Sequence, residues 1–461
     1  MIPCNLHTIS KIINAKLIGK NKKIFKISTD SRNIKNKKKC LFVALKGKKY
    51  DAHIFIKEAI ILGAEAILVE KQQFFLHKTP QLIVSNTFNA LIKIASWIRK
   101  QISIPIIGIT GSSGKTTVKE MSTSILKQTG NVLSTKNNFN NNIGVILTLL
   151  RLNKKHNFAI IEIGANNFKE ILWSTTKIYP KTVLINNIFI SHLTGFKSLL
   201  GVAKAKSEIF SGLSKKGNVI INNDSNYLSL WKKKLKNKKI YKFSIKRKKN
   251  VNFFSKNIKY YSHGTSFTLY TPKGKCKIYI PLLGIHNVSN AIAAATLSIS
   301  VNKNIKLSEI RSGLQKIKRI PGRLFPITLN KNNLLIDDSY NSNIGSTIEG
   351  IKILINMPNY RILIISDISE LGKNKKQYHK ILGKIINKTN INKTLSFGNI
   401  SKHITKSIKK QKRKHFINKN LLILYLTKLL SKNTKTTTLI KGSRKFKMEE
   451  IVYFLKEKFN V

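Results

Sequence analysis

The chain has 461 residues, 42% of them hydrophobic, which suits two or three globular domains and excludes a disordered protein. Its formal net charge is +66. Only ten of the 85 basic residues are arginine, and the lysines are spread over the whole chain. We therefore attribute the charge to a general composition bias and expect no dedicated nucleic-acid partner. The three cysteines (Cys4, Cys40 and Cys276) lack metal-ligand spacing and no apolar run approaches the ~18 residues of a membrane span, so we expect a cytoplasmic protein without disulfides.

Three segments follow one another, and each alternates strand-like and helix-like patterns. Residues 1–100 combine short apolar runs with helical stretches (strands 40–44 and 66–69, helices 53–62 and 89–99). Residues 101–318 contain near-continuous apolar runs that are typical of parallel strands buried on both faces (158–163 and 181–186), and then a lysine-rich stretch that predicts an antiparallel insert (240–280). Residues 319–461 begin a second series of apolar strands (333–337, 360–365, 393–396 and 437–440).

The most informative segment is Gly108-Ile-Thr-Gly-Ser-Ser-Gly-Lys-Thr-Thr117. It follows the apolar run 104–107 and precedes a helical pattern at 118–126. Strand, glycine loop and helix form the context of a Walker-type nucleotide site, although the first glycine stands one position earlier than in the strict pattern. A simple turn before a helix is the alternative, and the Lys-Thr pair after the last glycine disfavours it.

The residue types in this loop suit phosphate binding. Gly111 and Gly114 allow backbone N–H groups to surround a phosphate, and the helix N-terminus adds a partial positive charge. Lys115 can reach the outer phosphates, and the Thr116 hydroxyl can ligate Mg²⁺.

These patterns predict an α/β protein with three domains. The central domain (101–318) is expected to have a P-loop-type, mostly parallel sheet with flanking helices and to bind a nucleotide. A smaller α/β domain precedes it (1–100), and a Rossmann-like α/β domain follows it (319–461).

Acids are scarce, with 19 in the chain, so an acid inside an apolar strand is informative. Glu162 lies near the end of such a strand, and ligands of open α/β sheets collect at the carboxyl ends of strands. Glu162 is therefore a candidate to hold Mg²⁺ or to position water. The alternative is an ion pair with a lysine. His192 follows the next strand, and the pattern leaves its role open between structural and functional. Lys206 lies in an amphipathic helical stretch and by itself indicates a solvated lysine.

Seven short motifs follow one another along the chain: Thr110-Gly-Ser-Ser-Gly-Lys-Thr116, Asn140-Asn-Asn-Ile-Gly144, Ile161-Glu-Ile-Gly164, Ser191-His192, Ala203-Lys-Ala-Lys-Ser-Glu-Ile-Phe210, Gly284-Ile-His-Asn-Val-Ser-Asn290 and Pro321-Gly-Arg323. In this order they resemble the Mur ligases, the ATP-dependent amide-forming enzymes of peptidoglycan synthesis. The resemblance covers about residues 25 to 455.

The resemblance implies a role for each motif. Thr116 and Glu162 would hold one Mg²⁺ and His192 would serve a second. Lys206, rather than Lys204, matches a lysine that reacts with CO₂ and becomes a carbamate ligand in the metal site. Lys115, Glu162, His192 and Lys206 would form the catalytic set.

The resemblance also implies the binding residues. Those for ATP would be Gly111, Ser112, Ser113, Gly114, Lys115, Thr116 and Thr117, with Asn290 at the adenine and Arg323 and Asp338 at the phosphates and ribose. Those for the other substrates would be Ser28, Asp30, Ser31 and Arg32, at a uridine diphosphate in the N-terminal domain, and Asn141, Lys441 and Ser443.

Four further segments are similar to the Mur ligases that add a dipeptide: 192–196, 337–343, 366–372 and 441–444. They imply a monomeric enzyme that joins D-alanyl-D-alanine to a UDP-N-acetylmuramoyl tripeptide through an acyl phosphate, in the C-terminal ligase domain. The Asp-x-Pro-Arg motif typical of members that add the third residue does not occur in the sequence. Whether the tripeptide ends in diaminopimelate or lysine stays open.

Three alternatives remain. Another Mur step or folylpolyglutamate synthesis would use the same scaffold. A P-loop ATPase acting on nucleic acid would account for the charge. A non-catalytic binding protein is disfavoured, because Lys115, Glu162, His192 and Lys206 are all present.

Overall fold

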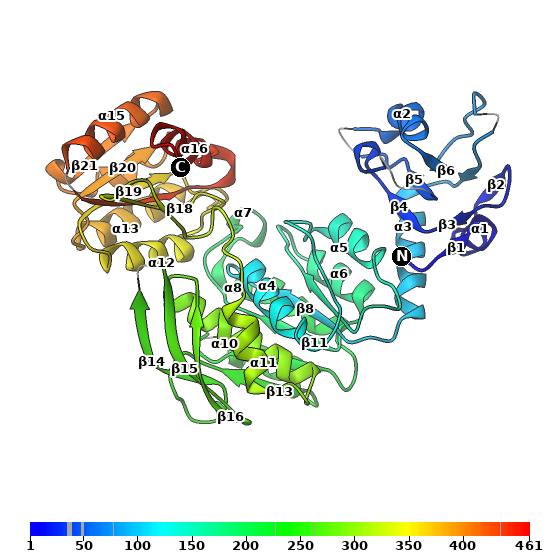
Figure 1. Ribbon diagram of the computed structural model, residues 1–461, viewed down its shortest axis with the longest axis horizontal. Coiled ribbons are helices and arrows are strands. Elements are labelled where there is room, and N and C mark those ends of the chain that lie inside the picture. Colours follow the sequence, from blue (N-terminus) through cyan, green and yellow to red (C-terminus); the bar gives the residue numbers. More distant parts are fainter. Residues whose placement is uncertain (35–38, 48–49, 77, 226, 262, 434) are drawn as a thin grey trace.

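The computed structural model describes residues 1–34, 39–47, 50–76, 78–225, 227–261, 263–433 and 435–461. It forms three α/β units, and Figure 1 shows the central one between the other two. The three-domain α/β fold expected from the sequence is confirmed; the residue ranges 1–100, 101–318 and 319–461 stay a prediction. Among the described residues, every helix is too short or too polar to cross a bilayer.

The N-terminal unit has a five-stranded sheet in the order β2-β7-β6-β5-β4, in which β2 is antiparallel to β7 and the other neighbours are parallel. Side chains alternate between its faces, so Leu41 and Val43 pack with α1 and α3 whereas Phe42 packs with α2. The bounds are β1 (Cys4–Asn5), α1 (Leu6–Ile13), β2 (Lys16–Ile18), β3 (Lys23–Ile24), β4 (Lys26–Ser28), β5 (Cys40–Val43), α2 (Ile56–Ile61), β6 (Ala64–Val69), β7 (Gln81–Ile83) and α3 (Thr87–Gln101).

The central unit has six parallel strands in the order β13-β12-β11-β8-β10-β9. Ile107 and Ile160 face α4 and α10, while Ile106 and Ile161 face the opposite core, which confirms burial on both faces. The bounds are β8 (Ile106–Thr110), α4 (Lys115–Leu126), β9 (Val132–Ser134), α5 (Asn142–Leu149), β10 (Phe158–Glu162), α6 (Glu170–Ile178), β11 (Thr182–Ile185), α7 (Leu193–Phe196), α8 (Leu199–Lys206), β12 (Asn218–Asn222), α9 (Leu228–Trp231), β13 (Lys239–Phe243), α10 (Ile285–Val301) and α11 (Leu307–Gln315).

The antiparallel insert is shorter than predicted. The expected range of 240–280 is wrong at its start, because β13 pairs in parallel with β12 as the edge of the central sheet. The antiparallel sheet begins with β14 (Phe254–Tyr261) and continues through β15 (Gly264–Thr271) and β16 (Gly274–Ile280). Neighbouring strands and helices cover a parallel edge strand only in part, so it can carry both lysines and apolar residues. The same mixture is typical of an antiparallel strand with one solvent-exposed face, so the sequence pattern does not distinguish the two.

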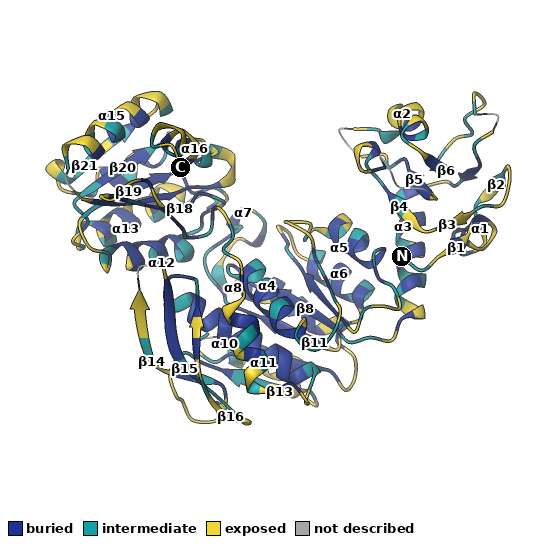
Figure 2. Cartoon of the chain, in the orientation of Figure 1, coloured by how far each residue is buried: buried dark blue, intermediate teal, exposed yellow. Residues whose placement is uncertain are grey.

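The C-terminal unit has the strand order β17-β18-β22-β19-β20-β21, parallel except at β17. Its core has two layers, one against α12 and α13 and the other against α15 and α16, and Figure 2 shows its strands as buried and the outer sides of its helices as exposed. The bounds are β17 (Phe325–Thr328), β18 (Asn333–Asp338), α12 (Ile344–Ile355), β19 (Tyr360–Ser366), α13 (Lys375–Asn387), β20 (Lys393–Phe397), α14 (Lys402–Thr405), β21 (Arg413–Phe416), α15 (Lys419–Lys432), β22 (Thr436–Lys441) and α16 (Glu449–Lys458).

Candidate active site

A cleft of about 950 Å³ lies between the central and C-terminal units. It is bordered by the loop between β8 and α4, the carboxyl ends of β10 and β18, and the N-termini of α10 and α12, as expected for open α/β sheets. Of the residues predicted for the site, those that line it are Ser112, Ser113, Gly114, Lys115, Thr116, Thr117, Asn141, Glu162, His192, Asn290, Arg323, Asp338 and Lys441.

The glycine loop at residues 111–114, named the phosphate loop after its predicted ligand, is closely packed. Gly114 has φ +75°, and a Cβ there would lie 2.6 Å from the amide atoms of Asn186 and Asn290, so the position requires glycine. The Lys115 ammonium turns back over the loop and donates a 2.8 Å hydrogen bond to the Gly111 carbonyl. Burial lowers the pKa of Lys115 most, Glu162 raises it, and Arg323 lowers it.

Glu162 ends β10 directly beside this loop. Its Oε2 accepts a 2.9 Å hydrogen bond from the Thr116 hydroxyl, and its Oε1 accepts one of 2.7 Å from the Asn140 amide. The residue is 1% exposed and no lysine is among these hydrogen-bond partners, which disfavours the ion-pair alternative. Two hard oxygen atoms, from Thr116 and Glu162, are thus held together at the end of the phosphate loop.

Arg323, on the C-terminal side of the cleft, also contacts Thr116. It follows Gly322, whose φ of +76° makes the turn before β17, and its Nη2 donates a 3.0 Å hydrogen bond to Thr116 Oγ1. Its guanidinium also lies 4.4 Å from the ring centroid of Tyr340. A cation from one unit therefore faces the phosphate loop of the other.

Asn290 lies below the loop in a buried chain of amides. Its Oδ1 accepts from Asn186 at 2.9 Å, its Nδ2 donates to Asn287 at 3.0 Å, and Asn186 also donates to the Ser113 carbonyl. Buried amides need such partners, so the chain fixes the N-terminus of α10 against the loop.

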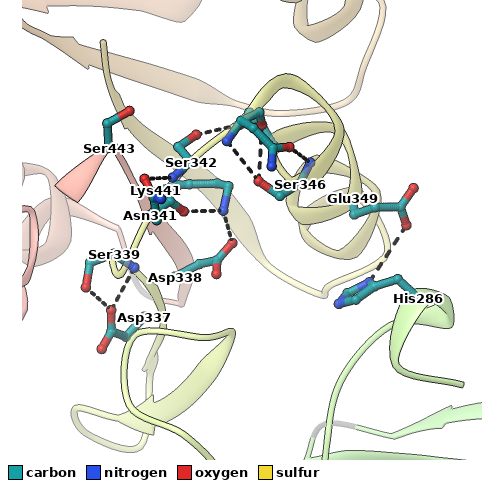
Figure 3. A network of polar contacts seen from close by, with 12 residues as sticks. His286, Asp337, Asp338, Ser339, Asn341, Ser342, Ser346, Glu349, Lys441 and Ser443 are labelled. Carbon is teal, nitrogen blue, oxygen red and sulfur yellow. Dashed lines mark hydrogen bonds and ion pairs between the residues drawn. The ribbon is translucent and has the colours of Figure 1, made fainter. Parts of the chain in front are cut away.

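Across the cleft, Asp338 and Lys441 form a buried ion pair, with Nζ and Oδ2 2.6 Å apart (Figure 3). Burial raises the pKa of Asp338, and Lys441 opposes that rise. The Asp337 carboxylate instead accepts from the Gly322 and Ser339 backbone N–H groups, so it stabilises the turn beside Arg323.

His192 does not point at Glu162 in this structure. It has φ +51° at the start of α7, and its Nδ1 contacts the Glu370 carboxylate of the C-terminal unit. That contact lowers the pKa of Glu370. Among the described residues, no three His, Cys, Asp or Glu side chains come together as a metal cluster.

Lys206 and Lys204 differ sharply in environment. Lys206 ends α8 and is 1% exposed, whereas Lys204 is exposed. Burial and, to a smaller extent, the Lys115 ammonium lower the pKa of Lys206 to about 7, while Glu170 and Glu208 oppose that change. The interpretation of Lys206 as a solvated surface lysine is therefore wrong, and the reason is that the helix turns this side chain toward Phe196, 5.5 Å from its ring centroid.

Residues 109–298 match the family model of the Mur ligase middle domain. Over 98% of both chains, the sequence is 49% identical to the UDP-N-acetylmuramoyl-tripeptide–D-alanyl-D-alanine ligase of Buchnera aphidicola subsp. Baizongia pistaciae. The chain belongs to the Mur ligase family. The Escherichia coli enzyme of the same name is 43% identical over 99% of both chains.

Solved structures agree with this assignment. A crystal structure of MurF from Acinetobacter baumannii has a TM-score of 0.90 and 30% identity over 99% of both chains. MurF ligase from Thermotoga maritima, solved in complex with ADP, has a TM-score of 0.80 at 22% identity and shares the fold. The family resemblance inferred from the motifs is confirmed.

The N-terminal motif of this Mur ligase lies outside the cleft. Ser28 and Asp30 form a turn after β4, in which Asp30 accepts hydrogen bonds from the Arg32 backbone and from its exposed guanidinium. The Arg32 hydrogen bonds hold the pKa of Asp30 low. Ser31 is buried. The structure therefore places the predicted uridine-diphosphate residues together, but apart from the nucleotide loop.

Three further predicted residues of the ligase lie outside the cleft lining: Gly111, Lys206 and Ser443. Ser443 is buried, accepts from the Ser369 N–H and donates its own N–H to Ser366. Sequence reasoning missed Asn140, Tyr340, Glu370 and Arg444 as individual residues, although each lies within or beside a quoted motif. Their presence as polar or aromatic residues within these motifs is the sequence feature that could have identified them.

Proposed function

We propose that this chain joins D-alanyl-D-alanine to UDP-N-acetylmuramoyl tripeptide at the expense of ATP. The relatives that are 49% and 43% identical along their whole length bear the name of this ligase. The observation that carries the assignment within the structure is the convergence of Lys115, Thr116, Glu162 and Arg323 at one end of the cleft. The product serves peptidoglycan synthesis, and hence cell wall formation, cell shape and division.

The reaction brings several anions together. The terminal carboxylate of the tripeptide attacks the γ-phosphorus of ATP, and ADP leaves with the oxygen that bridged the phosphates. The amine of D-alanyl-D-alanine then attacks the acyl phosphate carbonyl, phosphate leaves, and the amine gives up a proton. Lys115 and Arg323 both lie at the glycine loop, near enough that Arg323 lowers the pKa of Lys115, and together they can offset this negative charge.

The donor set fits Mg²⁺. Thr116 Oγ1 and Glu162 Oε2 are hard oxygen ligands 2.9 Å apart beside the phosphate loop. Mg²⁺ bound there would neutralise phosphate charge. We assign Thr116 and Glu162 to this ion and His192 to a second one, which requires His192 to leave Glu370.

We further propose that Lys206 reacts with CO₂ to form a carbamate ligand. Carbamylation needs the neutral amine, and burial with a pKa of about 7 makes that form abundant at neutral pH. The reaction joins the amine nitrogen to the CO₂ carbon and releases one proton. Exposed Lys204 has no comparable environment.

The remaining binding roles follow the cleft. We assign the phosphates to residues 111–117, the adenine to Asn290 and the ribose to Asp338, which would exchange its pairing with Lys441. Asn141 lines the tripeptide side of the cleft. Ser28, Asp30, Ser31 and Arg32 would bind the uridine diphosphate, while Lys441 and Ser443 support the dipeptide side.

We propose that the enzyme is a monomer. We place it in the cytoplasm, where ATP and UDP-linked precursors are available.

The deciding experiment is phosphate release with MgATP and UDP-N-acetylmuramoyl tripeptide, with and without D-alanyl-D-alanine. We expect sustained release only with the dipeptide, and both diaminopimelate and lysine tripeptides should be offered. A panel with single amino acids and folates tests the other ligases of this scaffold. Turnover with one of those, and none with the dipeptide, would contradict the proposal.

A further inference from the structure

Arg444 is a cleft residue that the functions described above do not use. It follows buried Ser443 after β22, lines the cleft, and its side chain is 61% exposed. The other lysine and arginine side chains lining the cleft in the described part of the chain are engaged elsewhere: Lys115 and Arg323 at the phosphate loop, Lys352 with Glu349, and Lys441 with Asp338.

The Arg444 side chain is held in place from two sides. Its Nη1 lies 2.7 Å from Glu449 Oε1, and its guanidinium carbon lies 5.8 Å from the centroid of the Tyr340 ring. The other oxygen of Glu449 is buried and has no hydrogen-bond partner among the described residues, so Arg444 is the partner that the structure gives this carboxylate. A guanidinium has five donors, and fixing one edge leaves the other edge for a second carboxylate.

The Tyr340 ring lies beside two cations. Arg323 lies 4.4 Å from the same ring centroid, so the phosphate-loop arginine and Arg444 are grouped around one tyrosine. An extended dipeptide spans about 7 Å from its amine to its carboxylate. The two guanidinium carbons can be no farther apart than their centroid distances, 4.4 Å and 5.8 Å, placed end to end, a range that includes this span. An amine placed beside the acyl phosphate at Arg323 would therefore leave the far carboxylate near Arg444.

We propose that Arg444 binds the terminal carboxylate of the incoming dipeptide and so selects an acceptor that carries a free acid one residue beyond its amine. The inference rests on the proposed function and adds the residue that recognises the second substrate. Bidentate carboxylate binding is the chemistry for which arginine is suited, and loss of a charge-assisted pair costs about 10- to 100-fold in affinity. Arg444 touches only the substrate's far end, so it is a specificity residue.

The test compares D-alanyl-D-alanine with D-alanyl-D-alaninamide, which lacks the carboxylate, in the wild type, Arg444→Met and Lys445→Met. Lys445 is the exposed neighbour that does not line the cleft and is the matched control. We expect the wild type and Lys445→Met to prefer the acid by about 10- to 100-fold in kcat/KM. Arg444→Met should lose that preference because its kcat/KM falls for the acid and stays the same for the amide. Its KM for ATP should be unchanged.

Equal use of acid and amide by the wild type would overturn the inference, and so would a preference retained in Arg444→Met. If Arg444→Met has no measurable activity with either acceptor, Arg444→Lys decides: a reduced acid preference supports carboxylate binding, and an unchanged preference shows a structural role and overturns the inference. If the wild type shows no turnover with any dipeptide, that result contradicts the proposed function instead, because it does not depend on Arg444.

Discussion

Arg323 Nη2 donates a 3.0 Å hydrogen bond to Thr116 Oγ1, across 207 positions of sequence and across the cleft between two units. Thr116 in turn donates to Glu162, so one hydroxyl connects the C-terminal unit to the proposed metal ligand. Phosphates and Mg²⁺ would bind at these same atoms. We therefore expect nucleotide binding and the approach of the C-terminal unit to be coupled, since both would depend on the partners of Thr116.

Lys115→Ala should remove most activity. Lys115 supplies a compact charge at the outer phosphates, so we expect a loss of about 3 kcal/mol or more of transition-state stabilisation, measured as kcat/KM for ATP. Lys127→Ala, at the exposed end of the same helix α4, is the control and should be neutral. Near-normal turnover of Lys115→Ala at saturating ATP would show that this loop is not the catalytic phosphate site.

Lys206→Ala should lose most activity and recover part of it in acetate or formate, because a small carboxylate can occupy the place of the carbamate. Lys204→Ala, with an exposed side chain two residues away, should lose little. Steady-state rates with and without the acids measure both effects. Identical behaviour of the two variants, or no recovery with any short carboxylate, would refute the assignment of Lys206.

The carbamate should also depend on pH. The pKa of Lys206 is lowered to about 7, so the ammonium predominates below pH 7 and the neutral amine above it. At a fixed concentration of dissolved CO₂, carbamate occupancy should therefore rise between pH 6 and pH 8. A ¹³C NMR signal from ¹³CO₂, absent in Lys206→Ala, measures this. A signal that is constant over that range would contradict the lowered pKa.

Lys441→Met should destabilise the C-terminal unit by about 3 kcal/mol, because it leaves Asp338 as an unpaired buried carboxylate. Burial raises the pKa of Asp338 above its ordinary value, so the deficit should shrink as the pH falls and the carboxyl becomes protonated. Urea unfolding at pH 7 and pH 5 measures it. The double variant Lys441→Met/Asp338→Asn should regain stability but not activity; no regain would show that the ion pair is not the cause.

ATP turnover should not respond to DNA or RNA, apart from salt-sensitive inhibition. The +66 charge comes mostly from dispersed lysines and should give only nonspecific binding. Turnover with each polymer at low and physiological salt checks this. Stimulation at physiological salt would favour a nucleic-acid-dependent ATPase.

The sequence by itself determined the local features of this protein. The phosphate loop needs glycine where φ is positive, the parallel strands need apolar residues on both faces, and Glu162 stands at the end of such a strand. These properties depend on neighbouring residues, so they can be inferred from short motifs. The edge strand β13 was the exception, because partial burial removes the distinguishing pattern.

The tertiary structure alone decided which side chains meet. Lys204 and Lys206 belong to one short helix, and only the packing of α8 makes Lys206 the buried one. His192 contacts Glu370, and Arg323 reaches Thr116, through the placement of two units whose residues are far apart in sequence. The desolvation that lowers the pKa of Lys206 and raises that of Asp338 exists only once the chain has folded, because it arises from the surroundings of a residue and not from its type.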